Sequence, residues 1–215
     1  MLKQLLITSV ITSIFSIGSF ASEETSSFVP ITSGVKSIKM NLNGESFTIM
    51  RNQTKGNKIS PLYETTNRGK PQPMILAKGI ETVGEVEFIE LMKKAQKDEQ
   101  IAIIDSRKPG WFEKLRIPGA LNVPFTDFDS KEESISAMED EMGVVQKEDG
   151  SLDFSNAKTV ALYCNGYWCG QTPAMIKNAK YSLLNMGYPV SKIKYYRGGM
   201  QAWTSLGFTV VGSGK

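Results

Sequence analysis

Short apolar runs and amphipathic stretches alternate along the second half of the chain. Five runs rich in β-branched and aromatic residues have the length and composition of strands. They are IAIID (101–105), ALNVPF (120–125), TVALY (159–163), IKYY (193–196) and FTVV (208–211). Strands that alternate with helices are typical of a parallel α/β sheet. The pattern therefore predicts an α/β domain.

Helical patterns occupy the segments between these runs. They cover residues 85–95, 130–142, 173–188 and 200–206. The first follows Thr82-Val83-Gly84-Glu85, which fits a capping box, and the second is acidic and expected to be exposed. The third places apolar residues on one face of a helix that Gly187 ends. These residues are Met175, Ile176, Ala179, Leu183 and Met186.

The chain before residue 80 has a different pattern. Residues 35–51 read as two strands joined at Asn43-Gly44, a good hairpin turn pair, and 52–74 is polar, rich in Gly and Pro, and predicted to be loop. A hairpin with a long loop is too small to form its own core. We therefore expect an extension over 22–79, with a loose Ser/Thr-rich start, that packs on a domain over 80–212.

The first 21 residues have the pattern of a secretory signal peptide. Lys3 precedes an apolar stretch, and Ser19 and Ala21 are the small residues expected before a cut. The alternative is a membrane anchor, but a spanning helix needs about 20 apolar residues and this stretch is shorter. We predict cleavage after Ala21 and a periplasmic or secreted protein without a membrane segment after cleavage.

The amino-acid composition excludes several kinds of catalytic and metal-binding site. The chain has 25 Lys and Arg against 22 Asp and Glu, and no basic run interleaved with aromatic residues, so nothing supports nucleic-acid binding. Histidine is absent, which excludes Cys-His and Ser-His nucleophile pairs. Two cysteines without histidine fill half of a tetrahedral zinc site. We predict no metal and no cofactor.

Both cysteines lie in ALYCNGYWCGQTPAM (161–175). Cys164 directly follows the strand 159–163, and Thr172 and Pro173 have the residue types of an N-cap and a first helical position. Free amides at a helix start stabilise an anion, so a thiolate or persulfide there would have a lowered pKa. The alternatives are a buried core thiol for Cys164 and a disulfide between Cys164 and Cys169.

Three stretches of the chain resemble the rhodanese family. IAIIDSRKPGWFEKLRIPGALNVPF (101–125) is similar to its Asp-x-Arg and Ile-Pro-Gly-Ala-x-Asn-x-Pro signature. VALYCNGYWCGQT (160–172) lies where the family has its cysteine loop, and YRGGMQAW (196–203) is similar to its Gly-Gly-x-x-x-Trp element. The likeness covers about 80–212, and it is closest to a secreted subgroup with an N-terminal hairpin extension.

The resemblance implies a three-layer domain with a central parallel sheet and assigns roles to residues. Cys164 would carry the persulfide, and Cys169 would be its redox partner or a spectator. The loop amides would form an anion cradle. The residues of this cradle are Asn165, Gly166, Tyr167, Trp168, Gly170, Gln171 and Thr172. Asp105 and Arg107 would support the loop or form an internal salt bridge, and Arg197 would face the pocket or solvent.

The chain also departs from the family pattern. Its cysteine loop has no cationic residue to attract an anion, and it is longer than usual. Trp111 replaces an acidic residue, and Leu115-Arg116 replaces Gly-His. The cysteine pair that the subgroup often has near residues 66–74 is absent. No arginine lies six residues after either cysteine, so a Cys-x5-Arg phosphatase is excluded.

Two functions remain open from the sequence. The first is a periplasmic sulfurtransferase that carries sulfane sulfur on Cys164 and exchanges it with a small sulfur-containing anion or a protein thiol. The second is a thiol-disulfide or partner-binding module with a Cys164–Cys169 disulfide.

Overall fold

The computed structural model describes residues 28–64 and 69–214, so the predicted signal peptide lies outside the described residues. A parallel sheet of five strands forms the centre of the described structure, in the order β3-β9-β8-β4-β5. The strands are β3 (Glu81–Val83), β9 (Ile193–Tyr196), β8 (Thr159–Tyr163), β4 (Ile101–Asp105) and β5 (Leu121–Asn122). The predicted α/β class is confirmed.

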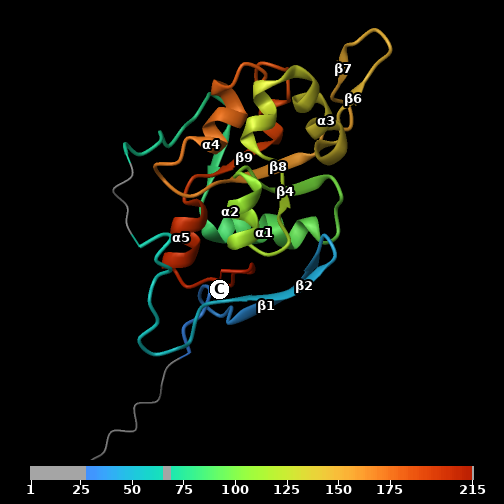
Figure 1. Cartoon of the computed structure of the whole chain (residues 1–215). Helices are drawn as coiled ribbons and strands as arrows, with labels where there is room; N and C mark the ends of the chain where they lie inside the picture. The colour runs from blue at the N-terminus through green and yellow to red at the C-terminus, as the bar shows by residue number, and fades with distance from the viewer. Residues whose placement is uncertain (1–27, 65–68, 215) are drawn as a thin grey trace, which may run out of the picture.

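Helices cover both faces of this sheet (Figure 1). One face carries α1 (Glu85–Ala95), α2 (Pro109–Lys114) and α5 (Gly199–Ser205). The other carries α3 (Lys131–Met142), α4 (Gln171–Pro173), the π-helical turn η2 (Ala174–Asn178) and the 3₁₀ turns η1 (Phe125–Asp129) and η3 (Val190–Lys192).

Alternate residues of each strand divide between two cores. On β8, Ala161 and Tyr163 face the α1 side, whereas Val160 and Leu162 face the α3 side. This follows from the two-residue period of a strand, and it explains why the strands of a sheet buried on both faces are apolar throughout. On β9, Tyr196 and Tyr195 divide in the same way.

An N-terminal hairpin adds a layer beyond α1. Strands β1 (Ser37–Leu42) and β2 (Glu45–Met50) form an antiparallel hairpin, as predicted. Its turn residues Asn43 and Gly44 have φ of 49° and 76°, the left-handed values that a two-residue hairpin turn requires. Met40, Leu42 and Ile49 join the core on the α1 side. Figure 1 shows the hairpin on the side of α1 away from the sheet.

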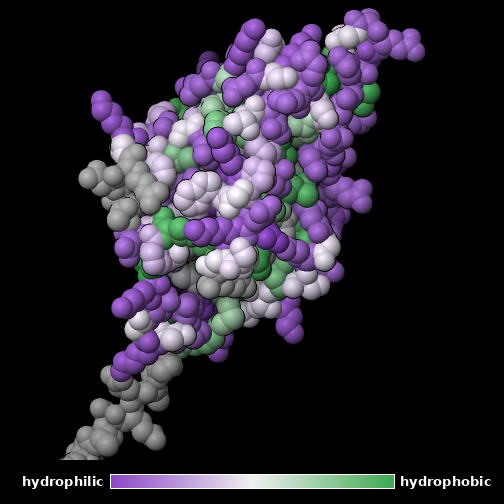
Figure 2. Space-filling model, viewed as in Figure 1, coloured by the Kyte–Doolittle hydropathy of each residue, from purple (hydrophilic) through white to green (hydrophobic). Residues whose placement is uncertain are grey.

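A second, smaller hairpin projects from the other end. It consists of β6 (Val145–Gln146) and β7 (Leu152–Asp153) and follows α3. In Figure 2 this projecting part is mostly hydrophilic, and the visible face of the molecule is dominated by hydrophilic residues with separate apolar areas. None of the helices in the described part of the chain is sufficiently long and apolar to cross a membrane.

Several predicted elements differ in the structure. Thr82 lies in β3, and α1 begins after Gly84 without a side-chain cap, so the capping box is wrong. Segment 208–211 pairs only through single bridges, Arg51 with Phe208 and Arg116 with Val211, because it runs between two separate partners. Segment 120–125 forms only the two-residue strand β5.

The predicted helix over 173–188 is also wrong. The chain leaves the helical conformation at Ala179, whose ψ is 154°. Leu183 and Leu184 then donate backbone hydrogen bonds back to Met175 and Ile176. The apolar residues still enter the core, because the returning chain presents Ala179 and Leu183 to it. Helix α3 is present, but one of its faces is buried rather than exposed.

Candidate functional site

The cysteine loop leaves the carboxyl end of β8 and is held by the start of α5. The amides of Met200 and Gln201 donate to the carbonyl oxygens of Cys164 and Asn165, both at 2.9 Å. Gly199 makes this approach feasible, because its φ is +51° and a Cβ there would collide with the carbonyl oxygen of Cys164. The YRGGMQAW stretch therefore positions the loop by direct backbone contact.

The two cysteines are buried and in contact. Each is a free thiol with 2% of its surface exposed, and the Cys164 Sγ lies 3.6 Å from the carbonyl oxygen of Cys169. Burial raises the pKa of Cys164, but hydrogen bonds from the Cys169 thiol, the Thr172 hydroxyl and amide, and the Gly166 amide outweigh it and lower the pKa to about 7. The hydrogen bond with Cys164, together with burial, raises the pKa of Cys169.

These contacts show which of the amides predicted to form an anion cradle lie against the two sulfurs. Gly166 and Thr172 direct amides to Cys164, and Asn165 and Gln171 direct amides to Cys169. Gly170 provides the turn before α4. Thr172 is not the N-cap that its position suggested, because α4 already begins at Gln171. Its hydroxyl instead lies 2.7 Å from that of Ser106, whose oxygen is also 2.8 Å from the carbonyl oxygen of Tyr163; when the Thr172 hydroxyl donates to the Cys164 thiolate, it accepts from Ser106.

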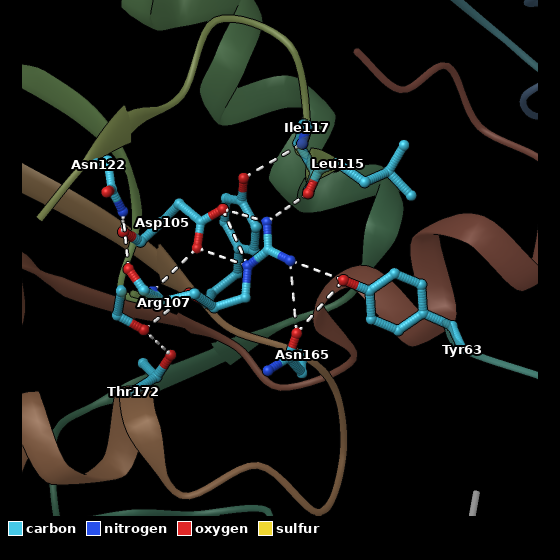
Figure 3. Close-up of polar contacts among 10 residues, drawn as sticks. Tyr63, Asp105, Arg107, Leu115, Ile117, Asn122, Asn165 and Thr172 are labelled. Atoms are coloured by element: carbon cyan, nitrogen blue, oxygen red, sulfur yellow. Dashed lines mark hydrogen bonds and ion pairs between the residues drawn. The ribbon is translucent and has the colours of Figure 1, made fainter. Parts of the chain in front are cut away.

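A buried ion pair supports the loop from β4 (Figure 3). Asp105 and Arg107 are both fully buried and joined through the guanidinium, with the shortest N–O distance 2.6 Å. Arg107 also donates to the carbonyl of Leu115 at 2.6 Å and to the side chain of Asn165 at 3.4 Å. Asp105 and Arg107 therefore form an internal salt bridge, and Arg107 also contacts the cysteine loop through Asn165.

The extension contributes a residue that the sequence did not indicate. Tyr63 accepts a hydrogen bond from Arg107 at 2.6 Å and donates to the Asn165 side chain at 3.3 Å (Figure 3). Its ring lies 6.5 Å from that of Trp111. The only indication in the sequence was an aromatic residue within the polar stretch 52–74. Nothing in the sequence identified Arg107, 44 residues away, as its partner.

A second contact from the extension covers the loop. The Gln72 amide donates to the Tyr167 carbonyl at 2.7 Å, and its side chain donates to the Trp168 carbonyl at 3.3 Å. Arg197 donates from Nε to the Gln72 carbonyl at 2.8 Å and stacks on the Tyr167 ring at 5.1 Å. Arg197 is thus half-buried beside the loop rather than free in solvent.

The lowered pKa predicts a pH dependence that can be measured. In the wild type, alkylation of Cys164 by iodoacetamide should rise with pH to a plateau with a midpoint near 7, because the thiolate is the reactive form. Cys169→Ala removes a donor to the thiolate, so the midpoint should move to higher pH. Intact mass spectrometry follows both proteins. A wild-type midpoint near the ordinary thiol value of about 8.5 would contradict the cradle.

Comparison with known proteins finds one family model that matches the chain and several solved structures with low sequence identity to it. A family model described as "Rhodanese-like domain" matches residues 88–206. No curated protein matches the chain. The structure of BH2092 from Bacillus halodurans is 19% identical, with 63% of this chain and 79% of that chain covered and a TM-score of 0.43.

Two further structures have a similarly low sequence identity and TM-score. The rhodanese-like domain of Alr3790 from Anabaena sp. is 15% identical, with 64% and 82% of the two chains covered and a TM-score of 0.40. A thiosulfate sulfurtransferase from Pseudomonas aeruginosa is 18% identical over 62% of this chain, with a TM-score of 0.42. The match covers 20% of that protein. Because the family model spans more than half of the chain and includes the cysteine loop, the chain belongs to the rhodanese-like domain family.

Proposed function

We propose that the chain is a periplasmic sulfurtransferase that carries sulfane sulfur as a persulfide on Cys164. The surroundings of the Cys164 sulfur carry this proposal. Two amides, a hydroxyl and a thiol donate to it and lower its pKa to about 7, although burial opposes them. A thiolate at neutral pH is the form that attacks a sulfur–sulfur bond.

The reaction needs no group beyond the cysteine and its donors. The Cys164 thiolate attacks the outer sulfur of thiosulfate, the sulfur–sulfur bond of thiosulfate breaks, and sulfite leaves with the electron pair. The persulfide then gives its outer sulfur to an acceptor thiolate, and the Cys164 thiolate is restored. Both steps conserve charge, and Cys164 carries one negative charge before and after each of them, on its own sulfur as a thiolate and on the outer sulfur as a persulfide.

The cysteine loop has no cationic residue, but the positive charge of Arg197 lies next to it, over the ring of Tyr167. Arg197 follows β9 and lies beside Tyr167, where a pocket of 160 Å³ also includes Met74 and Glu85. The burial of both thiols favours a small sulfur-containing anion as the donor, and the pocket borders the cysteine loop at Tyr167. The acceptor would be a small thiol or a protein thiol.

The proposal predicts which cysteine gains mass. Reduced protein incubated with thiosulfate should gain one sulfur atom in the wild type and in Cys169→Ser, but not in Cys164→Ser. Intact mass spectrometry measures this directly, and Cys169→Ser is the matched control because it keeps one buried thiol in the same loop. Absence of any gain in all three proteins would contradict sulfur transfer from thiosulfate.

The contact between the cysteines favours a second function, thiol-disulfide exchange. The Cys169 thiol donates to Cys164 and is itself buried, so the two sulfurs face each other. Cys169 could attack the inner sulfur of a Cys164 persulfide and release sulfide, which leaves a Cys164–Cys169 disulfide. The two thiol sulfurs are then oxidised and the sulfane sulfur is reduced. A wild-type mass lower by two hydrogens after thiosulfate treatment would support this function.

The periplasmic part of the proposal depends on residues 1–21. Exported protein purified from a Gram-negative host should begin at Ser22, because Ser19 and Ala21 fit a signal peptidase site. The mass of the mature chain tests this. A product that keeps residues 1–21 in the membrane fraction would instead favour an anchor and contradict cleavage.

A further inference from the structure

One buried tyrosine beside the cysteine loop has an unused hydroxyl. Tyr195 is fully buried in β9, and its hydroxyl has no hydrogen-bond partner among the described residues. The hydroxyls of four other buried tyrosines are all bonded. They are those of Tyr63, Tyr163, Tyr188 and Tyr196. Folded proteins rarely bury a hydroxyl without a partner, because its desolvation is not compensated.

The strand register places this hydroxyl near Cys164. Tyr195 pairs with Leu162 on β8, and both side chains belong to the core on the α3 side. Cys164 follows Leu162 by two residues, so the strand period directs it toward the same side. Arg197 follows Tyr195 by the same interval. The register of β8 and β9 thus places Tyr195 and the two residues that follow the strands, Cys164 and Arg197, at one end of the sheet and on the same side of it.

Electrostatic coupling supports this placement. Burial and the negative charges of Cys164 and Cys169 raise the pKa of Tyr195, whereas Arg197 lowers it. The hydroxyl therefore lies within electrostatic reach of both sulfurs and of the arginine. Because its pKa is raised, it keeps its proton at neutral pH and can act only as a neutral donor or acceptor.

The hydrogen-bond donors of the loop contact the Cys164 sulfur as it is without added sulfur. Gly166, Thr172 and Cys169 all donate to the Cys164 sulfur itself. A persulfide places a second sulfur about 2 Å beyond the first, and this outer sulfur carries the negative charge. Arg197 is engaged with the Gln72 carbonyl and the Tyr167 ring. The outer sulfur therefore requires a donor that the resting site does not use.

We propose that the Tyr195 hydroxyl donates a hydrogen bond to the outer sulfur of a Cys164 persulfide and so stabilises the sulfur-loaded form. This inference rests on the proposed sulfurtransferase function and adds a sulfur-binding residue to it. Tyr195 binds the product of the first transfer, not the resting thiolate. Its loss should therefore shorten the lifetime of the persulfide without changing the titration of Cys164.

Tyr195→Phe and Tyr188→Phe form a matched pair for the test. The Tyr188 hydroxyl donates to the Lys158 carbonyl at 2.6 Å, at the other end of β8. Each protein is reduced and loaded with thiosulfate or with a low-molecular-weight persulfide, and the decay of the added sulfur is followed by intact mass. The pH profile of Cys164 alkylation and the melting temperature are measured in parallel.

Tyr195→Phe should change the persulfide lifetime, whereas Tyr188→Phe should change the melting temperature. Tyr195→Phe should lose its persulfide about tenfold faster than the wild type, with an unchanged alkylation profile and an unchanged or higher melting temperature. Tyr188→Phe should melt at a lower temperature and keep the wild-type persulfide lifetime. If the wild type loads sulfur and Tyr195→Phe keeps it equally long, the role of Tyr195 is overturned while sulfur transfer stands. If the wild type loads no sulfur from either donor, the proposed function and this inference are both overturned.

Discussion

Replacement of Arg107 by Met is expected to lower the free energy of unfolding by about 3–5 kcal/mol, because it leaves the fully buried Asp105 carboxylate without its partner. Burial lowers the pKa of Arg107, but the charge and hydrogen bonds of Asp105 outweigh it and raise the pKa, so the guanidinium stays charged in the core. The variant also removes the donor to Tyr63 and to the Leu115 carbonyl. Urea denaturation followed by circular dichroism measures the loss.

Arg116→Met is the control for this change. Arg116 pairs with Glu45, but the two side chains are 20% and 34% exposed, so solvent screens the pair. Its replacement should lower the free energy of unfolding by about 1 kcal/mol or less. Equal losses for the two variants would show that the buried pair does not support the fold in the way the contacts indicate. Addition of Asp105→Leu to Arg107→Met should recover part of the lost stability, because no unpaired charge then remains.

The second large effect is expected from Gly199→Ala. A Cβ at this position would overlap the carbonyl oxygen of Cys164 and lie 2.9 Å from the Gly166 amide nitrogen, and the φ of +51° disfavours any residue with a side chain. Because both neighbours are backbone of the cysteine loop, the loop must move. A displacement of about 1 Å at a reacting group can cost on the order of 100-fold in rate. Sulfur uptake by Cys164 should fall by about that factor.

Gly110→Ala is the matched control for Gly199→Ala. Gly110 lies in α2 with nothing within 4 Å of a built Cβ. This variant should keep the wild-type rate of sulfur uptake, and its helix should be slightly more stable. Circular dichroism shows whether Gly199→Ala retains its fold. A folded Gly199→Ala protein with wild-type uptake would contradict the positioning of the cysteine loop by α5.

Local patterns in the sequence were sufficient for the central strands and for the position of Cys164. The strands 101–105, 159–163 and 193–196 were predicted with the bounds that the structure has. Each is a short apolar run between polar segments, and its conformation follows from burial on both faces. Asn43-Gly44 identified the hairpin turn for a similar reason, because only a few residue types accept its backbone angles.

Elements that depend on contacts distant in sequence were predicted less well. The segment 173–188 has a helical pattern, yet the chain leaves the helix at Ala179 and returns against Met175 and Ile176. The segment 208–211 has a strand pattern, but it finds only single-residue partners. In both cases tertiary packing overrides a local preference that is worth only a fraction of a kcal/mol per residue.

The sequence by itself determined the α/β class and the cysteine at the end of β8, because each depends on neighbouring residues, and the resemblance to the rhodanese family singled out Asp105 and Arg107. Only the tertiary structure decided that Tyr63 and Gln72 contact the cysteine loop, and that the buried, unpartnered Tyr195 hydroxyl lies within electrostatic reach of Cys164. Their hydrogen bonds and electrostatic couplings join residues far apart in the chain. A pattern of neighbouring residues carries no information about such partners, because the partner is brought into place only when the chain folds.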